Sequence, residues 1–407
     1  MVLTPSVSRR NFFAYIWHAT FFALAYSFMD VDTVMPAMLL KAGGNNFHIG
    51  LLTTILMGGS WLGQIFFAPF LYNRPRKKPY LLTGIIIRTI TLFAFAYLFL
   101  SYQKIDSHWF ITIILSLALI FSLSGSFAGI SYTDILGKSL LPEKRKKFFS
   151  IKQVIFSFGI FISAFAVKKL LRTYEFPENY FLLFLWAAIF LFIATFGFVI
   201  IKEVPVEIKR ITGIKSYFNA FKNEFRTNPN LLRYLLTINT LGIGISILPF
   251  SIAYLKQIHG LSGTGVGNLL IFKTAGLIVA GIFSYLYSQK LRYTQILYIA
   301  FSMALIMLVS VLLFSRYEFI FPVIFFTGGI YFSLFSISKS GILLEISDNQ
   351  NRPLYAGMAG AGSFFISLFP IIGGILIERT GFTTVFGIIL IILLSSLLFI
   401  RKIRCGG

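Results

Sequence analysis

Residues 179–201 read NYFLLFLWAAIFLFIATFGFVII, a run of 23 residues without a charged side chain. A helix rises about 1.5 Å per residue, so a run of this length crosses the hydrocarbon core of a bilayer, which is about 30 Å thick. Transmembrane strands need only about ten alternating residues, so longer runs indicate helices. Similar apolar segments lie at about 12–40, 47–72, 80–101, 109–136, 148–171, 231–255, 262–288, 294–315, 319–346, 353–377 and 382–400. The sequence therefore predicts an all-α polytopic membrane protein with twelve transmembrane helices.

The composition excludes several other classes of protein. Of the 407 residues, 57% are hydrophobic and 12% are charged, whereas a soluble domain carries about 25% charged residues. Together with a mean hydropathy of +0.82, this excludes a soluble enzyme and a disordered chain. The single cysteine, Cys405, allows no intrachain disulfide. We expect neither a metal site nor a cofactor.

The net charge of +22 does not indicate a nucleic-acid-binding protein, because the basic residues form short clusters between the apolar segments. With the N-terminus inside, the inner segments hold roughly three times as many Lys and Arg as the outer loops, a bias typical of cytoplasmic loops. This distribution predicts a multi-pass protein of the inner or plasma membrane, with both termini in the cytoplasm.

The longest gap between apolar segments, 202–230, separates six predicted spans from six. Its basic and apolar residues have the spacing of an amphipathic helix on the inner leaflet, and the alternative is a solvated linker. The two halves echo each other, because the glycine-containing tripeptides 49–51 and 266–268 each open the second span of a half. We expect an N-terminal six-helix bundle over 1–201, a cytoplasmic linker over 202–230, and a C-terminal six-helix bundle with a short tail over 231–407.

A basic stretch joins the second and third predicted spans. It reads PFLYNRPRKK over residues 69–78. This stretch resembles the motif Gly-x-x-x-Asp-Arg-x-Gly-Arg, followed by basic residues, of the major facilitator superfamily. Arg74 and the basic run match the motif, whereas Pro69, Asn73 and Arg76 replace its Gly, Asp and Gly. The resemblance covers essentially the whole chain and implies two pseudo-symmetric six-helix bundles that rock about a central cavity.

Ionisable residues inside the spans are candidates for function, because a charge at the bilayer centre costs about 2.5–3.5 kcal/mol on insertion scales. Asp30 and Asp32 lie beyond the middle of the first span, about 200° apart on a helix, so both cannot face one cavity. We expect at least one of them to bind substrate or a coupling ion; the alternative is a structural ion pair or a helix cap beside Pro36. Lys273 lies close to the midplane of the eighth span and is expected to line the central site.

Two further residues are predicted to bind substrate or ion. Arg88 lies about one third of the way into the third span, and the alternatives are that its long side chain reaches the inner interface or pairs with an acid. Asn239, in the seventh span, has polar groups that can bond a substrate or bridge helices. Gating or conformational roles are expected of charged residues near the inner ends of the spans, namely Arg74, Arg145, Lys339, Glu345 and Arg352.

These features predict a secondary active transporter rather than an enzyme. The sequence has no phosphate-binding loop, and its four histidines show no metal-ligand spacing. We expect alternating access to move a small anionic or zwitterionic solute, coupled to an ion. The alternative is a lipid-like or hydrophobic drug transporter or efflux protein of the same fold, with an integral-membrane enzyme less favoured. The expected partners of this monomer are a small-molecule substrate, a coupling proton or cation and the lipid bilayer, and no nucleic acid.

Overall fold

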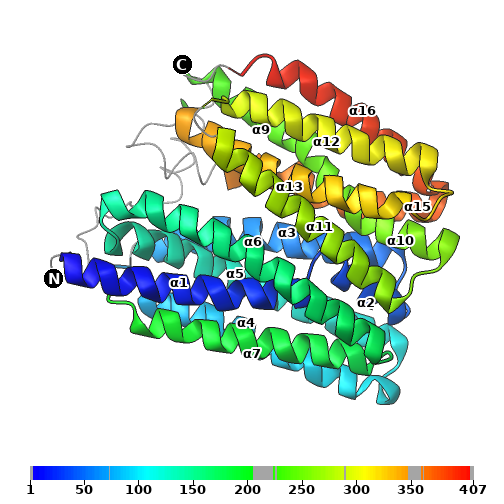
Figure 1. Cartoon of the computed structure of the whole chain (residues 1–407), viewed down its shortest axis with the longest axis horizontal. Coiled ribbons are helices and arrows are strands. Elements are labelled where there is room, and N and C mark those ends of the chain that lie inside the picture. Colours follow the sequence, from blue (N-terminus) through cyan, green and yellow to red (C-terminus); the bar gives the residue numbers. More distant parts are fainter. Residues whose placement is uncertain are drawn as a thin grey trace. The chain divides into compact units, whose positions relative to one another are not determined.

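The computed structural model describes residues 3–72, 74–204, 223–224, 227–287, 290–346, 359–360 and 362–403. Within these residues the secondary structure is helical and contains no strand (Figure 1). Each of the twelve apolar segments predicted from the sequence contains helix. Nine helices in the described part of the chain are long and apolar enough to cross a membrane. The prediction of an all-α polytopic membrane protein is therefore confirmed.

Contacts divide the chain into two compact units, of which the first comes from the first half of the sequence. It comprises Met1–Asp30, Lys41–Gly43 and Ile55–Ile211. Within it, α1 packs against α6 and α7, and α4 packs against α5 and α7. Its helices are α1 (Pro5–Phe28), the later part of α3 (Asn46–Tyr72), α4 (Lys78–Leu100), the short η1 (Tyr102–Lys104), α5 (Ser107–Ser139), α6 (Pro142–Thr173) and α7 (Glu178–Ile200).

The second unit comprises Val31–Leu40, Gly44–Thr54 and Thr212–Gly407. Within it, α11 and α12 pack on α13, and α16 packs on α9 and α12. Two short segments from the first half of the sequence thus belong to the second unit by their contacts. Its helices are α2 (Val34–Lys41), the start of α3, α9 (Pro229–Gly242), η2 (Ile243–Ser246), α10 (Ile247–His259), α11 (Gly263–Tyr287), α12 (Tyr293–Phe314), α13 (Ile320–Ile346), α15 (Phe364–Thr380) and α16 (Phe382–Ile400).

The first and seventh predicted spans are interrupted at matching points of the repeat. Residues 29–33 separate α1 from α2, and the 3-10 turn η2 separates α9 from α10. The helix that follows each interruption has a proline at its third residue, Pro36 in α2 and Pro249 in α10. Because proline has no N–H, the helical hydrogen bond to the carbonyl four residues earlier cannot form. Each interruption thus lies where a proline removes one helical hydrogen bond, although a proline alone does not require a break.

Glycine allows α11 and α13 to cross at close range. A side chain at Gly276 would overlap the backbone carbonyl of Phe326, and one at Gly329 would overlap the carbonyl of Lys273. Small residues that let two helix backbones approach are typical of packing in membranes. This crossing fixes the position of the α11 backbone at Lys273.

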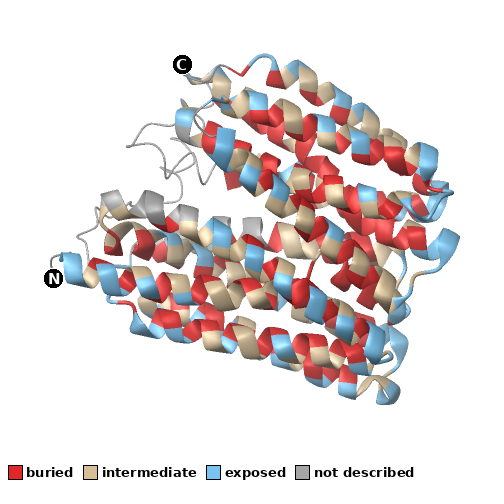
Figure 2. Ribbon diagram, viewed as in Figure 1, coloured by how far each residue is buried: buried red, intermediate tan, exposed pale blue. Residues whose placement is uncertain are grey.

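Many helical positions are exposed, as the pale blue segments of Figure 2 show, and large apolar residues are among them. On α4, Ile90 and Tyr97 are 61% and 71% exposed, and on α16 Ile391 is 70% exposed. Extensive exposed apolar surface on a soluble protein causes aggregation, whereas lipid tails solvate it. These faces are those expected of helices in contact with a bilayer.

Candidate substrate and ion site

The interruption in the first span holds a buried carboxylate that is paired with a cation. Oδ2 of Asp32 lies 2.5 Å from Nζ of Lys273 in α11, and the two side chains are 9% and 4% exposed. Both residues belong to the second unit. Two charges that leave water in this way depend on each other, because removal of either one leaves the other buried without its counter-charge.

Tyr331 of α13 relates this ion pair to the interruption of the seventh span. Its hydroxyl donates a hydrogen bond to the carbonyl of Leu241 at 2.8 Å, and its Cζ and hydroxyl oxygen lie 3.0 Å from the place of a side chain on Gly244. The phenol also interacts electrostatically with Asp32. One buried tyrosine therefore interacts with residues at both interruptions. We call Asp32, Lys273 and Tyr331 the ion-pair cluster.

The second carboxylate of the interruption lies in a different environment. Asp30 is 2% exposed and belongs to the first unit, whereas Asp32 belongs to the second. The boundary between the units thus falls between the two predicted ion-binding residues. Whether either carboxylate carries an ion stays a prediction.

Arg88 of α4 lies on aromatic rings within the first unit. Its guanidinium carbon is 4.1 Å from the centre of the Phe121 ring and 5.8 Å from that of Phe22. Gly125, one turn beyond Phe121 on α5, leaves room for the guanidinium, which lies 3.2 Å from the place of a side-chain carbon there. Nε of Arg88 is buried, and no described residue accepts a hydrogen bond from it. The structure thus places a cation beside rings and close to a helix backbone.

Asn239 is bonded to backbone groups at the start of α15. Its side-chain nitrogen donates to the carbonyls of Gly362 at 2.6 Å and of Leu235 at 2.8 Å. Its side-chain oxygen accepts from the N–H of Phe365 at 3.1 Å and, more weakly, from that of Ile366 at 3.4 Å. The first N–H groups of a helix have no partner within it, so this amide caps α15. Its predicted role in substrate binding stays a prediction.

The predicted gating residues are scattered over the described part of the chain. Arg74 is exposed, and its guanidinium carbon lies 4.6 Å from the centre of an aromatic ring. Lys339 is half-buried in α13 and Glu345 is exposed at the end of the same helix, while Arg145 belongs to α6. Arg352 lies outside the described residues. Gating by these five residues stays a prediction.

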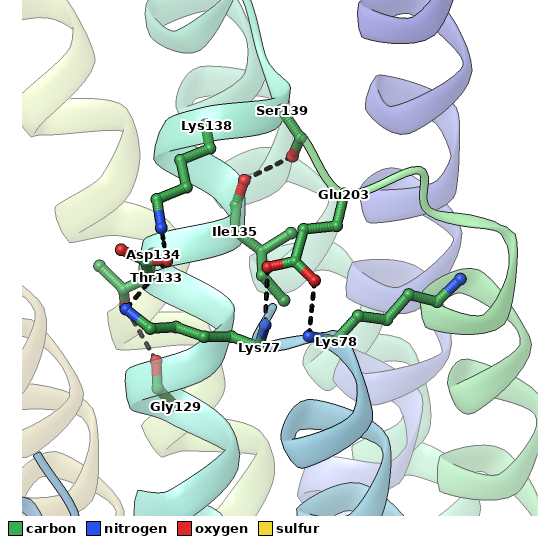
Figure 3. A network of polar contacts seen from close by, with 9 residues as sticks. All are labelled: Lys77, Lys78, Gly129, Thr133, Asp134, Ile135, Lys138, Ser139 and Glu203. Atoms are coloured by element: carbon green, nitrogen blue, oxygen red, sulfur yellow. Dashed lines mark hydrogen bonds and ion pairs between the residues drawn. The ribbon is translucent and has the colours of Figure 1, made fainter. Parts of the chain in front are cut away.

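A polar network at the start of α4 was missed by the sequence analysis (Figure 3). The carboxylate of Glu203 accepts hydrogen bonds from the backbone N–H groups of Lys77, at 2.7 Å, and Lys78, at 2.9 Å. A carboxylate at a helix N-terminus bonds unpaired N–H groups and opposes the positive end of the helix dipole. The capping residue lies more than 120 positions from the helix that it caps, so no local sequence signal could have identified it.

The same network pairs one cation of the basic loop before α4 with a carboxylate. Nζ of Lys77, whose side chain is 6% exposed, lies 3.0 Å from Oδ2 of Asp134 in α5. Lys138, one turn later on α5, pairs with the same carboxylate. The end of the loop that precedes α4 is thereby attached to α5 and to the segment after α7, all within the first unit.

Long apolar helices with ionisable groups inside them indicate a multi-pass membrane protein. The sequence model described as Major Facilitator Superfamily matches residues 20–338, and the chain belongs to this superfamily. The resemblance seen in the sequence is thus confirmed. No curated protein matches the chain.

Solved structures share the fold over nearly the whole chain. A bacterial homologue of the iron transporter ferroportin has a TM-score of 0.71 at 16% identity, with 98% of each chain covered. The xylose transporter XylE from E. coli has a TM-score of 0.69 at 12% identity, covering 97% of this chain and 96% of that one. The human organic anion transporter MFSD10 has a TM-score of 0.66 at 13% identity, covering 98% and 100%. At these identities the likeness establishes the fold and leaves the solute undefined.

Proposed function

We propose that the chain is a secondary transporter that moves a small anionic solute across a membrane by alternating access, together with a proton. The observation that carries this proposal is the buried ion pair between Asp32 and Lys273. Ionisable residues inside membrane helices are expensive and mark solute or ion pathways. A pair that joins an interruption in one span to the middle of another is suited to such a pathway.

The two members of the pair suggest how proton and solute are coupled. A proton on Asp32 removes the negative charge and releases the ammonium of Lys273 from this carboxylate. An anionic solute can then take the place of the carboxylate beside Lys273, so the charge in the site stays balanced. Anion and proton therefore bind together more readily than either binds alone, which is the requirement for symport.

Tyr331 supports the same reading. Its hydroxyl is anchored on Leu241 at the interruption of the seventh span and interacts electrostatically with Asp32. A change in the charge of Asp32 changes its electrostatic interaction with Tyr331. Through the hydrogen bond of Tyr331 to Leu241, this change acts on the interrupted segment that follows Leu241. We propose the inner or plasma membrane as the location, with both termini in the cytoplasm, from the excess of basic residues in the predicted inner loops.

The proposal is tested with purified protein in liposomes that contain a trapped pH dye. Succinate, glutamate, phosphate and 2-naphthalenesulfonate are added in turn as anionic probes, with glucose and tetraethylammonium as neutral and cationic probes. We expect at least one anion to acidify the lumen in liposomes with the wild-type protein and not in empty ones. Asp32→Asn should abolish this acidification.

Glu318→Gln is the matched control, because it removes one acidic group at an exposed position of the same unit. It should leave the acidification at the wild-type level. Acidification by Asp32→Asn protein equal to that of wild type contradicts the coupling. A response only to tetraethylammonium, or transfer of labelled lipid without response to any anion, contradicts the anionic solute and favours the drug or lipid alternative.

A further inference from the structure

We propose that the first unit contains a binding site for a flat aromatic anion, in which Arg88 and Lys152 hold the acidic group. The inference rests on the proposed function in taking the solute to be an anion, and it names the class of that anion. It depends only on residues of the first unit. None of them belongs to the ion-pair cluster.

Arg88 has five N–H donors and no acceptor for them in the described structure. Its buried Nε lacks a hydrogen-bond partner, and its recorded neighbours are the rings of Phe121 and Phe22 and the hydroxyl of Tyr26, with which it interacts electrostatically. An aromatic ring attracts the flat face of a guanidinium and leaves the N–H groups at its edge available. A carboxylate or sulfonate fits that edge, because it accepts two parallel hydrogen bonds.

Lys152 of α6 supplies a second cation near the first. Its Nζ lies 3.4 Å from the hydroxyl of Tyr132 and 5.1 Å from the centre of that ring. No carboxylate of the described residues pairs with it. The Tyr132 ring also lies 6.4 Å from that of His18 in α1, centre to centre. Neither cation forms an ion pair with a carboxylate of the described residues, so a bound anion would balance their charge.

Aromatic rings connect the two cations. Phe22, which contacts Arg88, stacks on His18 with 5.6 Å between ring centres and lies 6.1 Å from the ring of Phe156. Aromatic groups pack offset-stacked or edge-on, and each such pair contributes about 0.5–1.5 kcal/mol beyond the area that it buries. The acidic group of the ligand can thus bind the two cations, while its aromatic body packs against these rings. We call this set of residues the cationic-aromatic site.

The helix beside Arg88 offers open space. Gly129 of α5 lies one turn from Gly125, and residues four apart share a face of a helix. A side chain added at Gly125 would meet the guanidinium of Arg88, whereas one added at Gly129 would meet no atom within 4 Å. Gly129 is exposed. A ligand can therefore lie against α5 next to the guanidinium without displacing a side chain.

The inference is tested by titration calorimetry of the detergent-purified full-length protein with 2-naphthalenesulfonate. Methanesulfonate carries the same acidic group without the ring, and 2-naphthalenemethanol carries the ring without the charge. We expect 2-naphthalenesulfonate to bind at least tenfold more tightly than either. Arg88→Gln and Lys152→Gln should each weaken its binding about ten- to hundredfold, the loss that follows from a bond to a charged group.

Two control variants remove the same charges at exposed positions of α6, Arg172→Gln and Lys169→Gln. They should leave the affinity unchanged, and Arg88→Lys should retain part of it. An unfolding temperature equal to that of wild type shows that a variant is folded. If Arg88→Gln does not fold, the affinity of Lys152→Gln for 2-naphthalenesulfonate tests the site. Equal binding of 2-naphthalenemethanol, or wild-type affinity in Arg88→Gln or Lys152→Gln, overturns the site. If wild-type protein binds 2-naphthalenesulfonate in this way but no anion acidifies the liposome lumen, the proposed function is overturned and the site is not.

Discussion

The substitution Lys273→Met removes one charge of the ion-pair cluster and keeps most of the length and apolar volume of the side chain. Asp32 then remains buried, 9% exposed, without the ammonium that stood 2.5 Å away. Removal of one partner from a buried pair costs about 3–5 kcal/mol, because the remaining charge has lost its compensation. We therefore expect Lys273→Met to lower the free energy of unfolding by about this amount at pH 8.

Two further measurements separate this cause from a packing defect. The double variant Asp32→Asn with Lys273→Met contains neither charge, so it should be more stable than Lys273→Met alone. The loss in Lys273→Met should also shrink at pH 5, because a buried carboxylate that takes up a proton no longer carries the uncompensated charge. A packing defect depends neither on Asp32 nor on pH.

The assay is the reversible unfolding of the purified protein in mixed micelles as SDS is added, followed by tryptophan fluorescence. Wild type, both single variants and the double variant are measured at pH 5 and pH 8. A loss below 1 kcal/mol in Lys273→Met, or a double variant destabilised by the sum of the two single losses, would refute the reasoning. The ion pair would then contribute little to holding the first span against α11.

Three other predictions concern packing and caps. Gly329→Ala places a methyl group on the carbonyl of Lys273 and should lower stability by about 1–3 kcal/mol, whereas Gly387→Ala, which meets no atom within 4 Å, should not; equal unfolding midpoints would contradict this. Glu203→Gln weakens the cap of α4 and should cost about 0.5–2 kcal/mol, seen as faster proteolysis of the preceding loop, and an unchanged cleavage rate would argue against the cap. Asn239→Ala leaves backbone groups of α15 without partners and should cost about 1–3 kcal/mol, measured as a lower unfolding midpoint, while an unaltered midpoint with weaker solute binding would favour the substrate role.

The fold could be predicted from the sequence because every span in hydrocarbon must satisfy its own backbone hydrogen bonds. Runs such as 179–201 are apolar throughout, and a helix is the element that satisfies its own backbone in lipid. The position of the first interruption was harder to predict from the sequence. Pro36 was visible, but proline is tolerated inside many membrane helices, so its presence alone did not show that residues 29–33 leave the helix.

The candidate site was predicted as separate residues and not as contacts. Asp32 and Lys273 were each identified because charges inside a bilayer are costly, but their pairing depends on how segments more than 200 positions apart pack. Lys152 was not predicted to bind a ligand, because it does not lie deep inside a span. Its place near the end of a span fits an interfacial anchor, and only the structure shows it over Tyr132, whose ring lies near that of His18.

The coupling of proton and anion is tested most directly by the balance of their gradients in liposomes. One pH unit is worth the same free energy as a tenfold concentration ratio of the solute. For a monovalent anion carried with one proton, net flux should therefore stop when a tenfold outward solute gradient opposes one unit of inward proton gradient. We expect wild type to show this balance point. For Asp32→Asn we expect no balance point that depends on the pH gradient. A wild-type balance point that does not move with the pH gradient would contradict it.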